Sequence, residues 1–152
     1  MKNVEQEILE FYKAFLNFCN HVCINDPDAG KVHYELTDGH YFDLMGQLHR
    51  PKFLGHYDQI TPYLADADVA IKELEITAVT EDFGYATCLQ HFTGKAADGL
   101  PFNFTFRATS ILRKVEGEWK YVHEHFSFPV NMATKVADMN SAQELSKNIE
   151  LK

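Results

Sequence analysis

The sequence predicts an α+β domain in which helices cover one face of an antiparallel sheet. Near the N-terminus, apolar residues recur every three to four positions, which is typical of a helix packed on a core. In the second half, four long segments are rich in aromatic and β-branched residues and are separated by turn-forming residues. The order of the elements, with helices first and strands following one another directly, favours this fold class over alternating βαβ units.

The composition indicates a single globular domain. The chain has 152 residues, of which 45% are hydrophobic, and this is enough for one core. The 14 Lys and Arg residues are outnumbered by 22 Asp and Glu residues, so the net charge is −8 and we expect no nucleic-acid partner. The sequence has no apolar run long enough to span a membrane and no secretory signal pattern at its start, so we expect a cytoplasmic protein with no membrane partner.

The first predicted helix runs from Val4 to about Asn20. Its apolar stripe comprises Val4, Ile8, Phe11, Phe15 and Phe18, widened by Leu9, Tyr12 and Leu16. Residues 25–30, which follow this helix, are rich in Asn, Asp, Pro and Gly, and these residue types favour turns. The order of expected elements is a turn at 25–30, a short element at 32–36, a short strand at 41–44, a loop at 46–55 and a short helix at 57–65.

The four long segments predict an antiparallel meander. They span residues 69–79, 83–94, 102–115 and 118–128. Beyond Pro129, apolar residues at helical spacing between Met132 and Ile149 predict an amphipathic C-terminal helix. We therefore expect a domain at residues 1–130 and a C-terminal helical extension of that domain at residues 131–152.

Alternation along a strand assigns successive side chains to opposite faces of the sheet. In the last two long strands the even-numbered positions are mostly apolar, so we expect them to face the helix-covered interior: Phe104, Phe106, Val122, Phe126 and Phe128. The odd-numbered positions are expected on the outer face: Trp119, Tyr121, His123 and His125. So much aromatic surface predicts a homodimer through the outer sheet face.

Three polar side chains share the interior face with these apolar residues. They are Gln90, Ser110 and Glu124. A carboxylate is costly to bury unless it is paired, hydrated or protonated, and a ligand pocket would explain all three groups. The alternative is that Glu124 bonds to a histidine or a backbone amide and only supports the fold.

The second half of the chain carries motifs that resemble those of a known family. Three segments resemble motifs of the SnoaL-like group of the nuclear transport factor 2-like, ketosteroid-isomerase-like superfamily: Arg107-Ala108-Thr109, Gly117-Glu118-Trp119 and residues 122–127. Residues 41–43 and 55–60 resemble the same family, and the resemblance covers roughly residues 4–128. It implies a cone-shaped fold, in which helices close over a strongly curved sheet with a deep pocket inside and a dimer on the convex side.

The resemblance also implies candidate catalytic residues. Asp43 stands where ketosteroid isomerase has its general-base aspartate, and Tyr12 falls where that enzyme has its oxyanion-hole tyrosine. The second oxyanion donor, a protonated aspartate, would fall near Thr109 or Ser110, and neither is an acid. This departure argues against steroid isomerisation itself. Glu124 falls on the apolar pocket wall of that enzyme, so it is an additional carboxyl group.

Two functions remain open from these residues. One is a cofactor-independent isomerase, cyclase or dehydratase, in which Asp43 or Glu124 removes a proton next to a carbonyl group and Tyr12 stabilises the enolate oxygen. The other is a non-catalytic module that binds a small apolar or aromatic ligand or a protein partner. The association domain of calcium/calmodulin-dependent kinase II, which shares the His-x-His pattern and is an assembly module, illustrates this second possibility.

We expect neither a metal nor a cofactor. His123 and His125 share a strand face, but a metal site there would need His91 from the neighbouring strand as a third ligand. The cysteines, Cys19, Cys23 and Cys88, lack a Cys-x-x-Cys spacing and are expected to be small buried thiols. The loop histidines are expected to titrate around the pocket mouth: His33, His40, His49 and His56.

Overall fold

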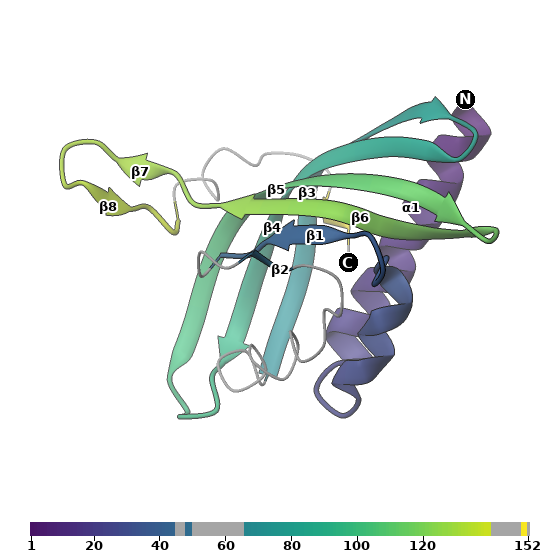
Figure 1. Cartoon of the computed structure of the whole chain (residues 1–152). Helices are drawn as coiled ribbons and strands as arrows, with labels where there is room; N and C mark the ends of the chain where they lie inside the picture. Colours follow the sequence, from purple (N-terminus) through teal and green to yellow (C-terminus); the bar gives the residue numbers. More distant parts are fainter. Residues whose placement is uncertain (45–47, 50–65, 141–149, 152) are drawn as a thin grey trace.

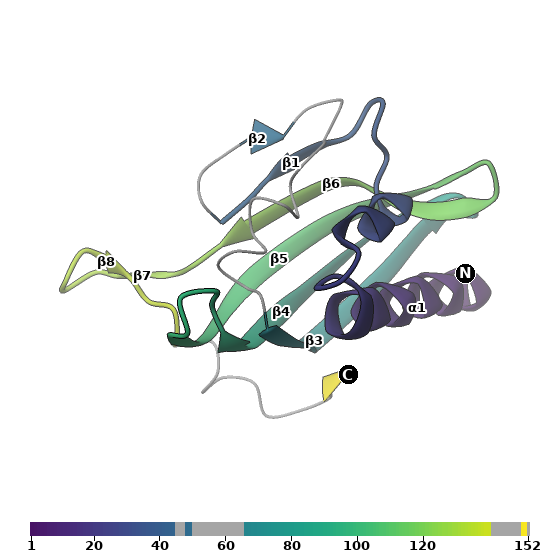
Figure 2. The same ribbon diagram turned by 90° about the horizontal axis from the view of Figure 1, so that it is seen from below.

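The computed structural model describes residues 1–44, 48–49, 66–140 and 150–151. A curved seven-stranded sheet is covered on one face by helix α1 (Lys2–Asn17) and two helical turns, η1 (Phe18–Val22) and η2 (Pro27–His33). Figure 1 shows this arrangement, and Figure 2 shows α1 lying against β3 when the molecule is seen from below. The predicted α+β class and the helical cover are therefore confirmed.

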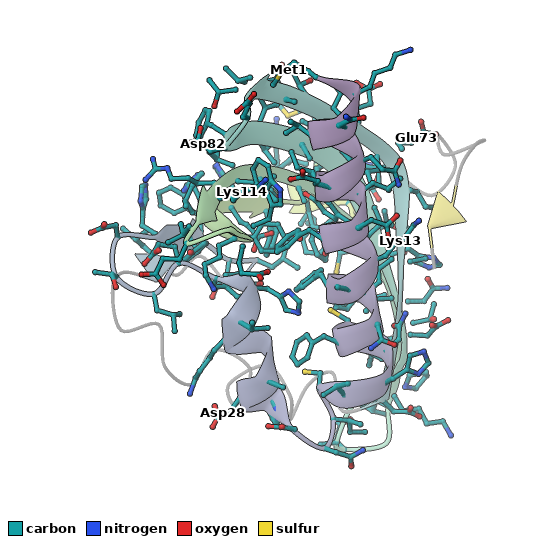
Figure 3. The ribbon with its side chains drawn as sticks, turned by 90° about the vertical axis from the view of Figure 1, so that its right-hand side faces the viewer. Met1, Lys13, Asp28, Glu73, Asp82 and Lys114 are labelled. Atoms are coloured by element: carbon teal, nitrogen blue, oxygen red, sulfur yellow. The ribbon has the colours of Figure 1, made fainter. Side chains whose placement is uncertain are left out.

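Helix α1 forms because its apolar stripe has a sheet to pack on. The side chains of the stripe fill the space between helix and sheet, which Figure 3 shows from the side. The helix ends in a π-helical turn, in which the Cys23 amide donates to the Phe18 carbonyl at 2.9 Å. The side chain of Asn20 then bonds both backbone groups of Val69, with its Oδ1 accepting at 2.7 Å and its Nδ2 donating at 3.0 Å. This bridge fastens the end of the helical segment to the sheet.

Four long strands form the predicted meander. They are β3 (Asp66–Thr80), β4 (Phe83–Lys95), β5 (Pro101–Val115) and β6 (Glu118–Ser127), and each pairs antiparallel with the next. The short strands β1 (His40–Phe42), β2 (Leu48–His49) and β9 (Glu150–Leu151) complete the order β2-β1-β6-β5-β4-β3-β9. Strand β1 runs parallel to β6 and so brings the segment after η2 alongside the last long strand.

The register between β5 and β6 shifts by one residue. Ile111 pairs with His123 whereas Leu112 pairs with Tyr121, so β6 contains one extra residue at a β-bulge. Before the bulge, Trp119 and Tyr121 point toward the helices and are buried. The prediction that these two side chains lie on the outer face was therefore wrong, because strict alternation holds only in a strand without a bulge.

Val122 is the residue that the bulge adds. Tyr121 and Glu124, on either side of the bulge, both face the interior, so the two residues between them, Val122 and His123, lie on the opposite side. Val122 is half-buried. The structure thus separates Val122 from the interior phenylalanines with which the sequence grouped it.

The C-terminal extension begins as a hairpin. β7 (Val130–Asn131) and β8 (Val136–Ala137) pair antiparallel, and Figure 1 shows them projecting beyond the end of β6. Lys135 has a φ of 62°, which an α-helix does not allow, and Asn131 Oδ1 accepts the amides of Ala133 and Thr134 in the turn. The helix predicted from Met132 is therefore absent at residues 130–140.

Three further predictions fall wholly or largely outside the described residues. They are the loop at 46–55, of which only β2 is described, the short helix at 57–65 and the remainder of the C-terminal helix at 141–149. Within the part of the chain that is described, none of the helices combines the length and the apolar character needed to cross a membrane.

Candidate functional site

Five polar side chains meet between the helical cover and the centre of the sheet, and we call them the polar cluster. Tyr12 comes from α1, Tyr34 follows η2, Ser110 lies on β5, and Tyr121 and Glu124 lie on β6. All five are buried. The rings of Tyr12 and Tyr34 lie 5.9 and 5.3 Å from the ring of Tyr121, measured between centroids. The structure thus places three tyrosines and one carboxyl group in a single enclosed region.

Glu124 is the carboxyl group of the polar cluster, and its pKa is shifted strongly from the ordinary value. It pairs with Ser110 across β5 and β6, and the Ser110 hydroxyl donates to Oε2 of Glu124 at 3.2 Å. The carboxyl is 1% exposed, and burial raises its pKa to about 8, although hydrogen bonds from Tyr34 and Ser110 act in the opposite direction. At neutral pH most molecules therefore hold Glu124 as a neutral acid that can donate a hydrogen bond.

The hydroxyls of Tyr12 and Tyr121 are fully buried and have no hydrogen-bond partner among the described residues. Ser110 and Tyr121 lie close enough to Tyr12 to lower its pKa, but neither contact has hydrogen-bond geometry. The net effect of burial raises the pKa of both tyrosines, so both remain protonated. Two O–H donors are therefore available beside Glu124.

Asp43 reaches the same face of the sheet through β1. Tyr41 of β1 pairs with Glu124, and Asp43 lies just beyond the end of β1, two residues after Tyr41. Continued alternation would direct it to the same side as Tyr41, roughly 7 Å further along the strand direction. Asp43 is buried. The Tyr41 hydroxyl donates to the Tyr121 carbonyl at 2.7 Å and contacts the Glu35 carbonyl at 2.9 Å, and these bonds hold β1 against β6.

An aromatic cluster lies next to the polar cluster, toward the C-terminal end of β4 and the N-terminal end of β5. Successive rings lie 5.1 to 5.9 Å apart between centroids, from Phe92 to Phe104, from Phe104 to Phe128 and from Phe106 to Phe126. Gln90 pairs with Phe106, is buried, and donates to the Cys88 sulfur at 3.9 Å. The predicted interior residues Phe104, Phe106, Phe126, Phe128 and Gln90 thus lie together, and Phe92 joins them.

Tyr34 and Tyr121 are site residues that the sequence pattern did not predict. Tyr121 faces inward because of the bulge, and Tyr34 lies after a 3₁₀ turn, where neither strand nor helix periodicity applies. His33, expected at a pocket mouth, is instead packed against Phe11, Phe15 and Phe18. Burial lowers the pKa of His33 to about 4, so this histidine is neutral at physiological pH.

Four histidines lie on the outer face of the sheet: His40, His91, His123 and His125. The side chain of His49 and the whole of His56, both predicted at the pocket mouth, lie outside the described residues. His123 Nδ1 donates to the His40 carbonyl at 2.8 Å, and His91 Nε2 contacts Asn103 Oδ1 at 2.8 Å. In the described ranges, no three His, Cys, Asp or Glu side chains are arranged to hold a metal ion. The three cysteines are free thiols, and burial raises the pKa of Cys23 to about 11.

Comparison with solved structures identifies the same architecture in other proteins. A nuclear transport factor 2-like protein of unknown function from Pseudomonas putida superposes with a TM-score of 0.74 at 22% identity, covering 91% of this chain and 96% of that one. A superfamily member from Salmonella enterica gives 0.73 at 22% identity, covering 86% and 94%. A ketosteroid isomerase-like protein from Erwinia carotovora gives 0.68 at 19% identity, covering 84% and 97%. At these identities the likeness establishes the fold.

Sequence comparison gives the family. No curated protein sequence matches the chain. The family model of the SnoaL-like domain matches residues 13–131, which include β1, the four long strands and most of the polar cluster. The chain therefore belongs to the SnoaL-like domain family.

Proposed function

We propose that this protein is a cofactor-independent isomerase, cyclase or dehydratase that acts on a small carbonyl compound through Asp43, Tyr12 and Glu124. The observation that supports this most directly is the fully buried Tyr12 hydroxyl, which lacks a partner and lies in the same cluster as a carboxyl group with a raised pKa. Neutral O–H donors in an enclosed site are suited to stabilise an oxygen that becomes negative during a reaction.

The chemistry begins at a carbon next to the carbonyl. The Asp43 carboxylate takes a proton from this carbon, the electrons of the C–H bond form a C=C bond, and the carbonyl π electrons move to oxygen. Tyr12 and neutral Glu124 donate hydrogen bonds to the resulting enolate oxygen. Return of the proton from Asp43 to another carbon gives isomerisation. Attack of the enolate carbon on a second carbonyl gives cyclisation, with the proton passing from Asp43 to the alkoxide that forms. Departure of a β-hydroxyl as water, with the proton supplied by Asp43, gives dehydration. General acid–base catalysis of this kind contributes typically ~10² to 10⁴ in rate.

Hydrogen–deuterium exchange tests the proton abstraction without knowledge of the natural substrate. The protein is incubated with 2-tetralone in D₂O, and loss of the α-proton signal is followed by NMR. We expect Asp43→Asn to lower the exchange rate by ~10² to 10⁴ and Tyr12→Phe to lower it by roughly 10² to 10³. Tyr85→Phe, at a residue 44% exposed on the outer face, is the matched control. An unchanged rate in Asp43→Asn would eliminate Asp43 as the base.

A non-catalytic binding module is the second candidate, and the aromatic cluster favours it. The partly buried rings of Phe92, Phe104, Phe126 and Phe128 pack around the buried ring of Phe106, and they suit a small apolar or aromatic ligand whatever the chemistry at Asp43. Native mass spectrometry of the purified protein separates the two candidates. A retained ligand that leaves chemically unchanged, together with no α-proton exchange, would favour binding alone.

We also propose a homodimer through the outer sheet face. There the rings of Phe42 and His125 lie 5.1 Å apart between centroids, the rings of His40 and His123 lie 4.7 Å apart, and Phe42 is 39% exposed. Phe42→Asp is expected to give a monomer in sedimentation velocity, because a buried charge in an isologous interface is repeated in both copies. Val32→Asp, an exposed apolar residue on η2, is the control that should remain dimeric.

A further inference from the structure

The bulge in β6 places a second tyrosine hydroxyl beside that of Tyr12. Tyr121 and Glu124 are three residues apart, and in a regular strand they would lie on opposite faces. The extra residue at the bulge turns both toward the helices. The ring of Tyr121 meets the ring of Tyr12 edge to face, with centroids 5.9 Å apart and an interplanar angle of 78°.

Neither hydroxyl has a hydrogen-bond partner among the described residues, although each side chain is fully buried. A buried polar group without a partner is unfavourable, and such groups are rare in folded proteins. Phenylalanine would fill the same space without this penalty. Two neighbouring tyrosines in this state therefore indicate that the hydroxyls have a partner from outside the chain.

The number of donors defines the partner. A carbonyl oxygen has two lone pairs and a phenolate or enolate oxygen has three, so either can accept one hydrogen bond from each of two O–H groups. Burial keeps both tyrosines protonated, so both act as donors at neutral pH. An ammonium group has only donors, so it could use the tyrosine oxygens as acceptors but would leave both O–H donors without a partner.

We propose that the hydroxyls of Tyr12 and Tyr121 jointly bind one carbonyl or enolate-like oxygen of the ligand. This inference rests on the proposed function for the nature of the ligand and adds Tyr121 as a residue that contacts the reacting oxygen. Neutral Glu124, held by Ser110 and Tyr34, donates the third hydrogen bond when the bound oxygen becomes negative and gains a third lone pair. Tyr121 contributes a donor that strict alternation along β6 would have directed away from the site.

Binding of 4-nitrophenol tests the proposal, because its phenolate oxygen resembles an enolate oxygen and its visible absorption reports ionisation. Affinity is measured by calorimetry for the wild-type protein, Tyr12→Phe, Tyr121→Phe and the double variant. We expect each single variant to bind about 10- to 100-fold more weakly, since each loses one hydrogen bond to a charged oxygen. The bound phenolate fraction should fall in parallel, and the double variant should lose less than the product of the two single effects.

Stability provides the readout that a purely structural role would not give. Because its hydroxyl is unpaired in the free protein, Tyr121→Phe should be as stable as the wild type, or more stable, in urea denaturation. Tyr41→Phe is the matched control: its hydroxyl is paired with backbone carbonyls, so this variant should lose stability and keep its 4-nitrophenol affinity. Failure of the wild type to bind 4-nitrophenol, or a destabilised Tyr121→Phe with unchanged affinity, would overturn the proposal.

The α-proton exchange assay separates this proposal from the catalytic one. Asp43→Asn should keep its 4-nitrophenol affinity while losing exchange of 2-tetralone. If the wild type shows no exchange and Tyr121→Phe nevertheless loses affinity, the two-hydroxyl oxygen site stands and the catalytic function fails. If exchange occurs and Tyr121→Phe changes neither rate nor affinity, the catalytic function stands and the role of Tyr121 fails.

Discussion

Replacement of Glu124 by glutamine is expected to change how the stability of the protein depends on pH. In the folded protein burial raises the pKa of Glu124 from 4.5 to about 8. Because the folded-state value is the higher one, the fold favours the protonated acid. The stability associated with this group is fully present below pH 4.5 and is lost as the pH rises toward 8.

The size of this effect follows from the same values. At about 1.4 kcal/mol for each pH unit, a rise from 4.5 to about 8 corresponds to about 5 kcal/mol. This is an upper bound, because any water that enters the site solvates the carboxylate and reduces the cost. Glutamine has the shape of the neutral acid and does not ionise, so Glu124→Gln should not show this loss.

Urea denaturation of the wild type and of Glu124→Gln at about pH 5 and about pH 8.5 measures the difference. We expect similar free energies of unfolding at the lower pH and a variant more stable by several kcal/mol at the higher pH, on the order of the bound above. The exposed Glu81→Gln is the control and should follow the wild type. If wild type and Glu124→Gln lose the same free energy between the two pH values, Glu124 is not a buried neutral acid.

Three other perturbations address the fold around the site. Burial lowers the pKa of His33 from 6.5 to about 4, so the folded protein should lose up to about 3 kcal/mol of unfolding free energy as the pH falls through this range. His33→Phe should remove this loss in an acid titration followed by circular dichroism. Asn20→Ala should cost about 1 to 3 kcal/mol in urea denaturation because Val69 loses partners for both backbone groups, and Asn20→Asp, which keeps the acceptor, should cost less. Gly39→Ala should lower the free energy of unfolding by about 1 to 3 kcal/mol, because the added Cβ would overlap the Glu35 carbonyl. Gly99→Ser, where space is open, tests backbone strain alone. Equal losses of stability in the two variants would exclude the steric explanation.

The elements with a clear local period could be predicted from the sequence. Helix α1 and strands β3 to β6 agree with the predicted ranges within a few residues, because each buries a repeating set of apolar side chains. The C-terminal segment was different, since apolar residues near Met132 and Val136 fit a helix and a hairpin equally well. The turn geometry at Asn131 and Lys135 selects the hairpin.

The site could be predicted only in part. Gln90, Ser110 and Glu124 face the interior because regular alternation applies where they lie. Tyr121 could not be placed, since a bulge arises from the pairing of two strands and leaves no mark in the period of one strand alone. Asp43 and Tyr12 came from family resemblance, and the structure buries both.

The single tryptophan marks the contact between α1 and the sheet. Trp119 Nε1 donates to Glu7 of α1 at 2.9 Å, and the Lys114 ammonium lies 5.3 Å from the centre of the indole ring. If α1 separates from the sheet, the indole enters water and its fluorescence shifts to longer wavelength. A ligand bound at Tyr12 that leaves α1 in place does not disturb the indole. Intrinsic fluorescence therefore provides a natural probe of helix undocking that is separate from ligand occupancy.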